Sequence, residues 1–177
     1  MANSQQNYFE MFGLEPNFSI DIPKLSSKLR TLLNSVHPDR FASSGAQQQM
    51  LSMQKTTQLN DAFAVLKNPV KRAQYLLHLK TGIDTAKDHT VNDPEFLMQQ
   101  LELREELEDI VAGGNISRLN QFADKISELE ESQEEQMSEL FARQPLNTEE
   151  LEKAIYKLQF LHKTLSDIEQ AEDKLLS

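Results

Sequence analysis

The sequence contains no cysteine and no tryptophan, and it has only five glycines in 177 residues. The lack of cysteine excludes disulfides, thiolate metal ligands and a thiol nucleophile. The few glycines form no phosphate-binding loop, and the four histidines lack the spacing of a metal-binding pair on one helix face. These absences argue against an enzyme, and we expect no cofactor, no metal site and no catalytic residue.

Long apolar runs are also missing, so no segment is predicted to cross a membrane. The first seven residues have neither the pattern of a secretory signal nor that of an Arg-rich transit peptide, and we expect a location in a bacterial-type cytoplasm. With 38% apolar and 26% charged residues, the chain is typical of a protein with one or two compact domains.

Charge differs between the two halves of the chain. Residues 1–80 contain nine Lys/Arg and five Asp/Glu, whereas residues 81–177 contain nine Lys/Arg and twenty-three Asp/Glu. The excess of acid argues against nucleic-acid binding in the second half, because phosphate contacts need cations. Since the charge changes close to Gly82, we predict two domains, residues 1–80 and 92–177, joined by a linker at 81–91.

The first half has the periodicity of four helices. The predicted elements are a short helix between the Asn7 cap and Gly13, a helix from the Asp21 cap to about Val36, a helix over about 46–67, and a short helix from Pro69 to about Gly82. The residues predicted to face the core are Ile22, Leu25, Leu29, Leu32, Leu33, Val36, Leu59, Ala62, Phe63, Leu66, Val70, Ala73, Leu76 and Leu77.

The tripeptide His37-Pro38-Asp39 lies between the second and third predicted helices. Proline fixes its own φ and disfavours helix for the residue before it, so His37 must leave the helix and present its ring beside the Asp39 carboxylate. Taken alone, the tripeptide is also an ordinary helix stop, because X-Pro-Asp commonly begins a turn. Its position between two periodic helices favours a contact loop for a partner.

The first half resembles the J-domain of DnaJ-type co-chaperones over about residues 7–80. The resemblance rests on His37-Pro38-Asp39-Arg40-Phe41, on Leu59-Asn60-Asp61-Ala62-Phe63-Ala64-Val65-Leu66, and on Asn68-Pro69-Val70-Lys71-Arg72-Ala73-Gln74-Tyr75. It implies a helical hairpin with two short flanking helices that docks on a DnaK-like ATPase chaperone and stimulates its ATP hydrolysis. The residues implied to bind the chaperone are His37, Pro38, Asp39, Arg40, Lys28 and Lys24. Val36 and Asn34 replace a common aromatic and a frequent basic residue of the family, which indicates a specialised chaperone partner.

The second half is predicted to be an antiparallel bundle of three helices, so the complete fold is predicted to be all-α. The helices begin at the caps Asn92-Asp93, Asn115 and Asn147, where Glu150 is the predicted capping-box partner. Gly113-Gly114 and Gln144-Pro145 end the first two helices, and such short connections force neighbours to run antiparallel. The predicted core residues of the last two helices are Leu119, Phe122, Ile126, Leu129, Met137, Leu140, Phe141, Leu151, Ile155, Leu158, Leu161, Leu165 and Ile168.

The helix after Asn92-Asp93 has two separate apolar faces. At 100° per residue, one face contains Phe96, Leu103, Leu107, Ile110 and Val111, and the other contains Leu97, Met98 and Leu101 among acidic residues. Only one face can enter the core of a small bundle, so the second face is either covered by the first domain or binds a partner. A single wide core stripe is the alternative. Tyr156 and Phe160 fall on the polar side of the last helix and are predicted to complete the second face.

Over its full length the chain resembles the HscB family, the J-type co-chaperones of iron–sulfur cluster assembly, which combine a J-domain with an acidic three-helix C-terminal domain. The resemblance is carried by Phe96-Leu97-Met98-Gln99-Gln100-Leu101-Glu102-Leu103-Arg104-Glu105-Glu106-Leu107-Glu108. It implies that the C-terminal domain binds the cluster scaffold protein IscU and that the J-domain presents this complex to an HscA-type chaperone. The residues implied to bind the scaffold are Leu97, Met98, Leu101, Glu102, Glu105, Asp109 and Phe160. At Asp109 the family would have glutamate.

Two other functions are compatible with the sequence. A J-domain co-chaperone of similar architecture could serve a different client, although the Gly/Phe-rich and cysteine-repeat regions of general DnaJ proteins are missing. A phosphorelay module belongs to another class, because helical bundles can present a phosphorylatable histidine. His162 is the candidate for this role, but its position near the core stripe is more typical of a packed residue.

Overall fold

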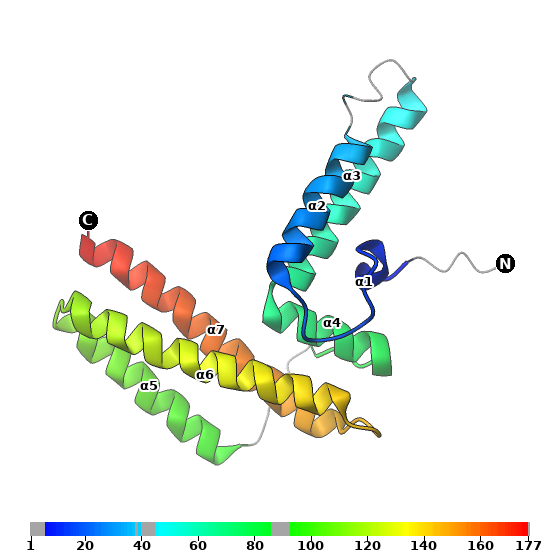
Figure 1. Ribbon diagram of the computed structural model, residues 1–177. Helices are drawn as coiled ribbons and strands as arrows, with labels where there is room; N and C mark the ends of the chain where they lie inside the picture. Colours follow the sequence, from blue (N-terminus) through cyan, green and yellow to red (C-terminus); the bar gives the residue numbers. More distant parts are fainter. Residues whose placement is uncertain (1–5, 38, 40–44, 86–92, 177) are drawn as a thin grey trace. The chain divides into compact units, whose positions relative to one another are not determined.

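The computed structural model describes residues 6–37, 39, 45–85 and 93–176, and over these ranges it contains seven helices and no strand. The helices are α1 (Tyr8–Met11), α2 (Ile22–Val36), α3 (Ala46–Lys67), α4 (Pro69–Thr81), α5 (Pro94–Ala112), α6 (Ile116–Ala142) and α7 (Thr148–Leu176), as Figure 1 shows. The all-α prediction is therefore confirmed. None of the helices described is both long and apolar enough to cross a membrane.

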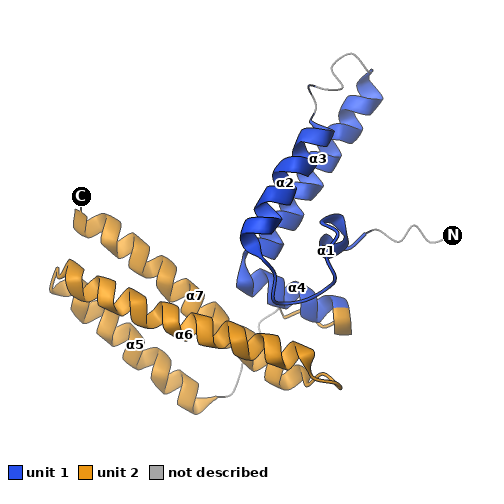
Figure 2. Cartoon of the chain, viewed as in Figure 1, with its two compact units in different colours: residues 1–79 blue, residues 80–177 orange. Residues whose placement is uncertain are grey.

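The chain divides into two compact units, an N-terminal unit of residues 1–79 and a C-terminal unit of residues 80–177 (Figure 2). The division lies within α4, which runs two residues past it. Of the linker predicted at 81–91, residues 86–91 lie outside the described part of the chain.

Local capping explains where the helices of the N-terminal unit begin. Asn7 and Glu10 form a capping box at α1, in which each side chain accepts the other residue's backbone N–H at 3.0 Å. Asp21 caps α2 by accepting the Lys24 N–H at 2.8 Å. Gly13 has a φ of 61°, a left-handed conformation that favours glycine and ends the first turn of helix. The predicted caps and the ends of these helices are confirmed.

The core of the N-terminal unit lies between the α2–α3 hairpin and α4, which follows α3 directly (Figure 1). Its buried apolar residues are Phe9, Phe12, Phe18, Leu25, Leu59, Ala62, Leu66, Val70, Ala73, Leu76 and Leu77. On α2 only Leu25 is fully buried, and the other five predicted core residues of this helix are half-buried. A hairpin of two helices covers each helix from one side, so the predicted α2 stripe is not enclosed completely.

Two polar side chains fasten α4 to the rest of the N-terminal unit. Arg72 is buried, donates to the Leu66 carbonyl at 2.8 Å, and places its guanidinium 4.6 Å from the centroid of the Phe18 ring. The Tyr75 hydroxyl accepts the Tyr8 N–H at 3.0 Å, and the two tyrosine rings stack with centroids 4.5 Å apart. Burial raises the pKa of Tyr75, and the hydrogen bond from Tyr8 opposes this rise.

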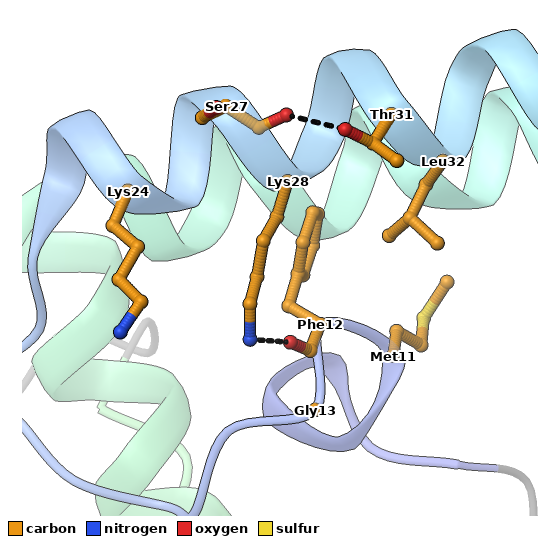
Figure 3. A pocket seen from close by; sticks show the side chains of 8 residues that line it. All are labelled: Met11, Phe12, Gly13, Lys24, Ser27, Lys28, Thr31 and Leu32. Atoms are coloured by element: carbon orange, nitrogen blue, oxygen red, sulfur yellow. Dashed lines mark hydrogen bonds between the residues drawn. The ribbon is translucent and has the colours of Figure 1, made fainter.

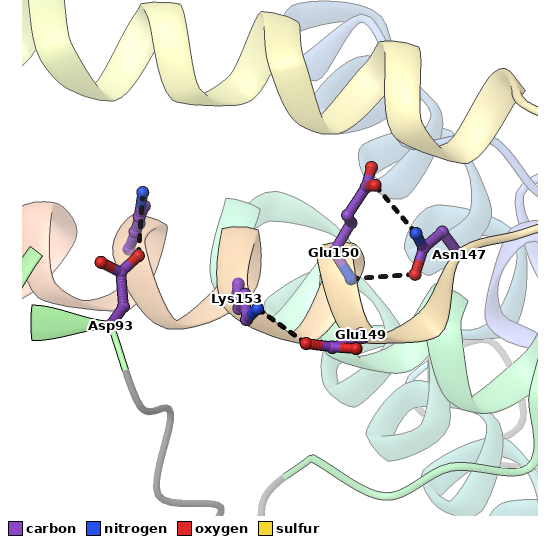
Figure 4. A network of polar contacts seen from close by, with 6 residues as sticks. Asp93, Asn147, Glu149, Glu150 and Lys153 are labelled. Carbon is purple, nitrogen blue, oxygen red and sulfur yellow. Dashed lines mark hydrogen bonds and ion pairs between the residues drawn. The ribbon is translucent and has the colours of Figure 1, made fainter. Parts of the chain in front are cut away.

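The C-terminal unit is a bundle of the three long helices α5, α6 and α7 (Figure 1). Asp93 caps α5 by accepting the Phe96 N–H at 3.0 Å, and Asn115 caps α6 by accepting the Arg118 N–H at 3.0 Å. At α7, Asn147 accepts the Glu150 N–H at 3.2 Å, and its side-chain amide donates to the Glu150 carboxylate at 2.8 Å (Figure 4). These contacts confirm the helix starts that the sequence predicted.

The bundle core is built from one face of each helix. Its central cluster contains Leu103, Ile110, Leu119, Phe122, Ile126, Leu161, Ile168 and Ala171, with Leu107, Leu129, Phe160 and Leu165 packed at its edge. Val111 is 36% exposed, so its predicted place in the core is wrong. It lies in the last turn of α5, at the margin of the apolar stripe, where α6 and α7 do not cover it fully.

Candidate functional site

The second apolar face of α5 is exposed. Leu97, Met98 and Leu101, here called the α5 patch, are 47%, 59% and 53% exposed. Phe96, Leu103 and Ile110 on the first face are each at most 5% exposed. The prediction that the two faces differ in burial is confirmed, and a single wide core stripe is contradicted. The α5 patch is therefore an apolar surface with no cover from its own bundle, and its role in binding stays a prediction.

Acidic residues surround the α5 patch. Glu102, Glu105 and Asp109 are all exposed, and helical periodicity places them on the same side of α5 as Leu101 and Met98. Glu106 differs from them, because its carboxylate lies 2.7 Å from Lys125 Nζ on α6. An apolar centre with a charged rim is the usual composition of a protein-binding surface.

The aromatic residues of α7 lie in the seam between α7 and α5. Tyr156 and Phe160 both meet the Phe96 ring edge-on, with centroids 5.8 and 5.7 Å away, and both are half-buried. Phe96, the first buried residue of α5, therefore covers both aromatic rings. A helical wheel of α7 alone could not show this contact. Because Leu97 directly follows Phe96, Phe160 lies beside the turn of α5 where the patch begins.

The same turn of α5 carries an ion pair to α7. Asp93 Oδ2 lies 3.4 Å from Lys157 Nζ, and this ammonium lies 5.4 Å from the centroid of the Phe96 ring. The Phe96 N–H lowers the pKa of Asp93, partial burial opposes the shift, and the Lys157 ammonium lowers the pKa further. Figure 4 shows Asp93 together with the neighbouring pair of Lys153 and Glu149, whose charged atoms are 2.7 Å apart. Sequence reasoning missed Lys157, because contacts between distant helices leave no periodic signal.

At the other proposed site, α2 ends at Val36 and His37 takes an extended backbone conformation with φ −60° and ψ 131°. His37 Nδ1 accepts the Asp39 N–H at 3.3 Å, and Asp39 Oδ2 lies 3.5 Å from the same nitrogen. The side chains of His37 and Asp39 are 54% and 91% exposed. The expected departure of His37 from the helix is confirmed. Pro38 and Arg40 lie outside the described residues.

The two predicted contact lysines of α2 differ in their surroundings. Lys24 is exposed, whereas Lys28 is half-buried and donates from Nζ to the Phe12 carbonyl at 2.7 Å (Figure 3). Phe12 is the C-cap of α1, so the Lys28 ammonium satisfies a carbonyl at the negative end of that helix. Both lysines line a pocket of 390 Å³ between α1 and α2. Lys28 thus helps to hold α1 on α2, a contact that its spacing on α2 did not reveal.

Sequence reasoning also missed three exposed apolar residues at the start of α3. Met50, Leu51 and Met53 are 62%, 51% and 61% exposed. Between them, Ser52 is buried and donates its hydroxyl to the Val36 carbonyl at the end of α2. This contact places the three residues at the same end of the hairpin as His37.

Comparison with known proteins identifies the family. A sequence model of the HSCB C-terminal oligomerisation domain matches residues 92–169. The co-chaperone protein HscB homolog of Aliivibrio fischeri (strain MJ11) is 41% identical over 171 residues, which cover 96% of this chain and 99% of that protein. The chain belongs to the HscB co-chaperone family. The HscB homolog of Vibrio vulnificus (strain YJ016) is likewise 41% identical and covers 96% of this chain.

Solved structures of HscB proteins have the same fold. Chaperone HscB from Vibrio cholerae superposes with a TM-score of 0.79 at 37% identity, covering 96% of this chain and 99% of that one. Human co-chaperone protein HscB has a TM-score of 0.82 at 22% identity, covering 96% of this chain and 83% of that one, a likeness of fold. HscB proteins are co-chaperones and not enzymes, which confirms the prediction that the chain is not an enzyme.

His162 on α7 is partly buried and faces Glu130 of α6. Its Nδ1 lies 2.7 Å from Glu130 Oε1, and its side chain is 40% exposed. Within the described residues, no group of three or more histidines and acids could hold a metal ion. The exposed α5 patch and the exposed His37 and Asp39 stay the predicted contacts for partners.

Proposed function

We propose that this HscB-family protein is a co-chaperone of iron–sulfur cluster assembly in the bacterial cytoplasm. Its C-terminal unit binds an IscU-type scaffold, and its N-terminal unit delivers the scaffold to an HscA-type, DnaK-like chaperone. The observation that carries the proposal is the α5 patch, in which three large apolar side chains stay exposed on a helix whose opposite face is buried.

The α5 patch has the energetics of a binding surface. Fully burying one large apolar side chain is worth about 1.5–3 kcal/mol. Because Leu97, Met98 and Leu101 are 47%, 59% and 53% exposed, covering what remains of their surface favours association with a partner. Met98 is unbranched and adapts its shape to the surface it meets. The acids Glu102, Glu105 and Asp109 steer a basic partner toward the patch and raise the association rate more than the final affinity. Phe160 adds an aromatic edge from α7.

The His37 loop is the proposed contact for the ATPase chaperone. His37 and Asp39 present a ring and a carboxylate to solvent. Arg40 and the exposed Lys24 add positive charge for an acidic surface of the chaperone. Lys28 contributes through its position between α1 and α2, because its ammonium already donates to Phe12.

The mechanism is a coupling of two binding events and not a reaction of this chain. The scaffold held on the C-terminal unit stays at a high effective concentration beside the chaperone. Contact of the His37 loop stimulates ATP hydrolysis by the chaperone, and hydrolysis converts weak capture of the scaffold into tight capture.

Calorimetric titration of the full-length protein with an IscU-type scaffold tests the proposal. The triple variant Leu97→Ala, Met98→Ala, Leu101→Ala should lose more than about tenfold in affinity, since truncating hot-spot residues costs about 1–3 kcal/mol each. Its helicity and melting temperature should stay unchanged. Val111→Ala removes an exposed apolar side chain elsewhere on α5 and serves as the control. A triple variant that binds the scaffold like the wild type would show that the α5 patch is not the scaffold site.

A further inference from the structure

The first turn of α5 is fastened to α7 by three residues, Asp93, Phe96 and Lys157, here called the α5–α7 latch. Asp93 accepts the Phe96 N–H with Oδ1 at 3.0 Å, while its Oδ2 lies 3.4 Å from Lys157 Nζ. The Lys157 ammonium also lies 5.4 Å from the centroid of the buried Phe96 ring. One carboxylate thus caps α5 and at the same time holds a cation that reaches across from α7.

The latch lies beside both parts of the proposed scaffold site. Leu97 and Met98 follow Phe96 directly in the chain, and Phe160 meets the Phe96 ring at 5.7 Å. The first turn of a helix is its least constrained part, because its N–H groups have no partners within the helix. Without a tie to α7, the turn that carries Leu97 and Met98 would be free to shift relative to Phe160.

We infer that Asp93 and Lys157 are positioning residues for the scaffold site. Their ion pair holds the first turn of α5 against α7, so that Leu97, Met98 and Phe160 form one preformed apolar surface. The inference rests on the proposed function and extends it to residues that act through Phe96 and need not touch the scaffold. A preformed surface binds more tightly, because fewer side chains and backbone groups lose freedom on association.

The bundle contains a matched pair that supplies the control. Lys125 on α6 lies 2.7 Å from Glu106 on α5, and its ammonium lies 5.7 Å from the centroid of the buried Phe122 ring. Lys125 therefore resembles Lys157, because each lysine pairs with an acid associated with α5 and lies near a buried phenylalanine. This phenylalanine is on the lysine's own helix for Lys125 and on α5 for Lys157. Glu106 faces away from the α5 patch on the helical wheel, so this second pair should not orient the patch.

The test compares Lys157→Met with Lys125→Met in the full-length protein. Methionine matches the apolar stem of lysine up to Cε and lacks the charged ammonium. We expect Lys157→Met to weaken binding of an IscU-type scaffold about three- to tenfold in calorimetry, and Lys125→Met to change it by less than about twofold. Both variants should melt at similar temperatures, since neither lost ion pair is fully buried: the side chains are 36% and 22% exposed for Lys157 and Asp93, and 49% and 40% for Lys125 and Glu106. Lys157→Arg should retain wild-type affinity because it keeps the cation.

A double-mutant cycle decides whether Lys157 acts through Asp93. Asp93→Asn keeps an oxygen that caps the helix but removes the charge, so it should reproduce the affinity of Lys157→Met. The double variant should bind no more weakly than either single variant. Losses that add in the double variant would show that Lys157 touches the scaffold itself, and equal affinities of Lys157→Met and Lys125→Met would show that the latch has no special role. Either result overturns the inference.

The triple alanine variant of the α5 patch separates failure of the latch from failure of the function. If this variant binds the scaffold like the wild type, the proposed function is wrong and the inference falls with it. If it loses binding while Lys157→Met does not, the scaffold site stands and only the positioning role is overturned.

Discussion

The two units of the molecule present their proposed contact residues in different ways. In the N-terminal unit, His37 and Asp39 stand in a loop where the backbone leaves helix geometry at the end of α2. In the C-terminal unit, the α5 patch lies on a regular helix whose opposite face is buried. A short loop can aim a few polar groups, whereas a helix face can display a continuous apolar area. The loop suits a brief triggering contact, and the helix face suits one that holds a client.

The charge of the two halves supports this division of tasks. Residues 1–80 have four more basic than acidic residues, whereas residues 81–177 have fourteen more acidic than basic residues. Since the halves attract surfaces of opposite charge, they should bind different partners and lose binding independently. Variants confined to one unit test whether the two units bind their partners independently.

The largest effect is expected in the His37 loop. His37→Gln should remove most of the stimulation of an HscA-type chaperone's ATPase, measured as steady-state hydrolysis, and should leave scaffold binding intact. The melting temperature should hardly change, because the His37 side chain is 54% exposed. His78→Gln changes an exposed histidine on α4 and is the matched control. Equal stimulation by the two variants would refute the role of the loop, and loss of scaffold binding in His37→Gln would refute the independence of the units.

Truncation of a side chain should affect the stability of the protein very differently on the two faces of α5. Leu103→Ala truncates a residue that is 5% exposed and should lower the free energy of unfolding by about 2–5 kcal/mol. Leu101→Ala, two residues earlier on the exposed face, should change it by less than about 0.5 kcal/mol. Urea denaturation followed by circular dichroism measures both. Similar losses would mean that the α5 patch is covered in solution.

A smaller loss of stability is expected when the contact between Tyr75 and α1 is removed from the N-terminal unit. Tyr75→Phe leaves the Tyr8 N–H without its acceptor and should cost about 1 kcal/mol of stability, with scaffold binding unchanged. Burial raises the pKa of Tyr75 above that of the unfolded chain, so the contribution of its protonated form is complete below about pH 10 and is lost as the pH rises through the folded-state pKa. Thermal melts between about pH 8 and about pH 11 should therefore show a weaker alkaline loss of stability in Tyr75→Phe than in the wild type.

The smallest effect is expected from the acids around the α5 patch. Glu102→Lys and Glu105→Lys should slow association with the scaffold about two- to tenfold at low salt and change dissociation little, because rim charges mainly steer the encounter. Stopped-flow measurements at low and high salt would show the difference fade as charges are screened. Glu139→Lys reverses an exposed acid on α6 and should have a weaker effect. Equal slowing by all three variants would indicate that the overall negative charge of the C-terminal unit steers association, and that the acids beside the α5 patch have no special part in it.

Local chemistry made much of the fold predictable from the sequence. Asn7, Asp21 and Asn115 cap helices where predicted, because a cap depends on a side chain and an N–H three residues away. The two faces of α5 were predictable for the same reason, since helical periodicity relates neighbours a few residues apart. Helix patterns also predicted a contact loop at His37 and a place for Phe160 beside the second face of α5. The partner assigned to each of these residues came from the family resemblance.

Only the tertiary structure decided which of these residues meet. Lys28 was predicted as an exposed contact of α2, yet it donates to Phe12 across the α1–α2 interface. Val111 lies at the margin of a stripe that neighbouring helices cover incompletely. Lys157 and Asp93 are far apart in the chain and meet only because α7 packs against the start of α5. The sequence determines where each helix begins and ends and which side chains lie on each of its faces. Packing between helices determines which of these side chains make contacts, because contacts between helices depend on distances that the sequence of one helix does not contain.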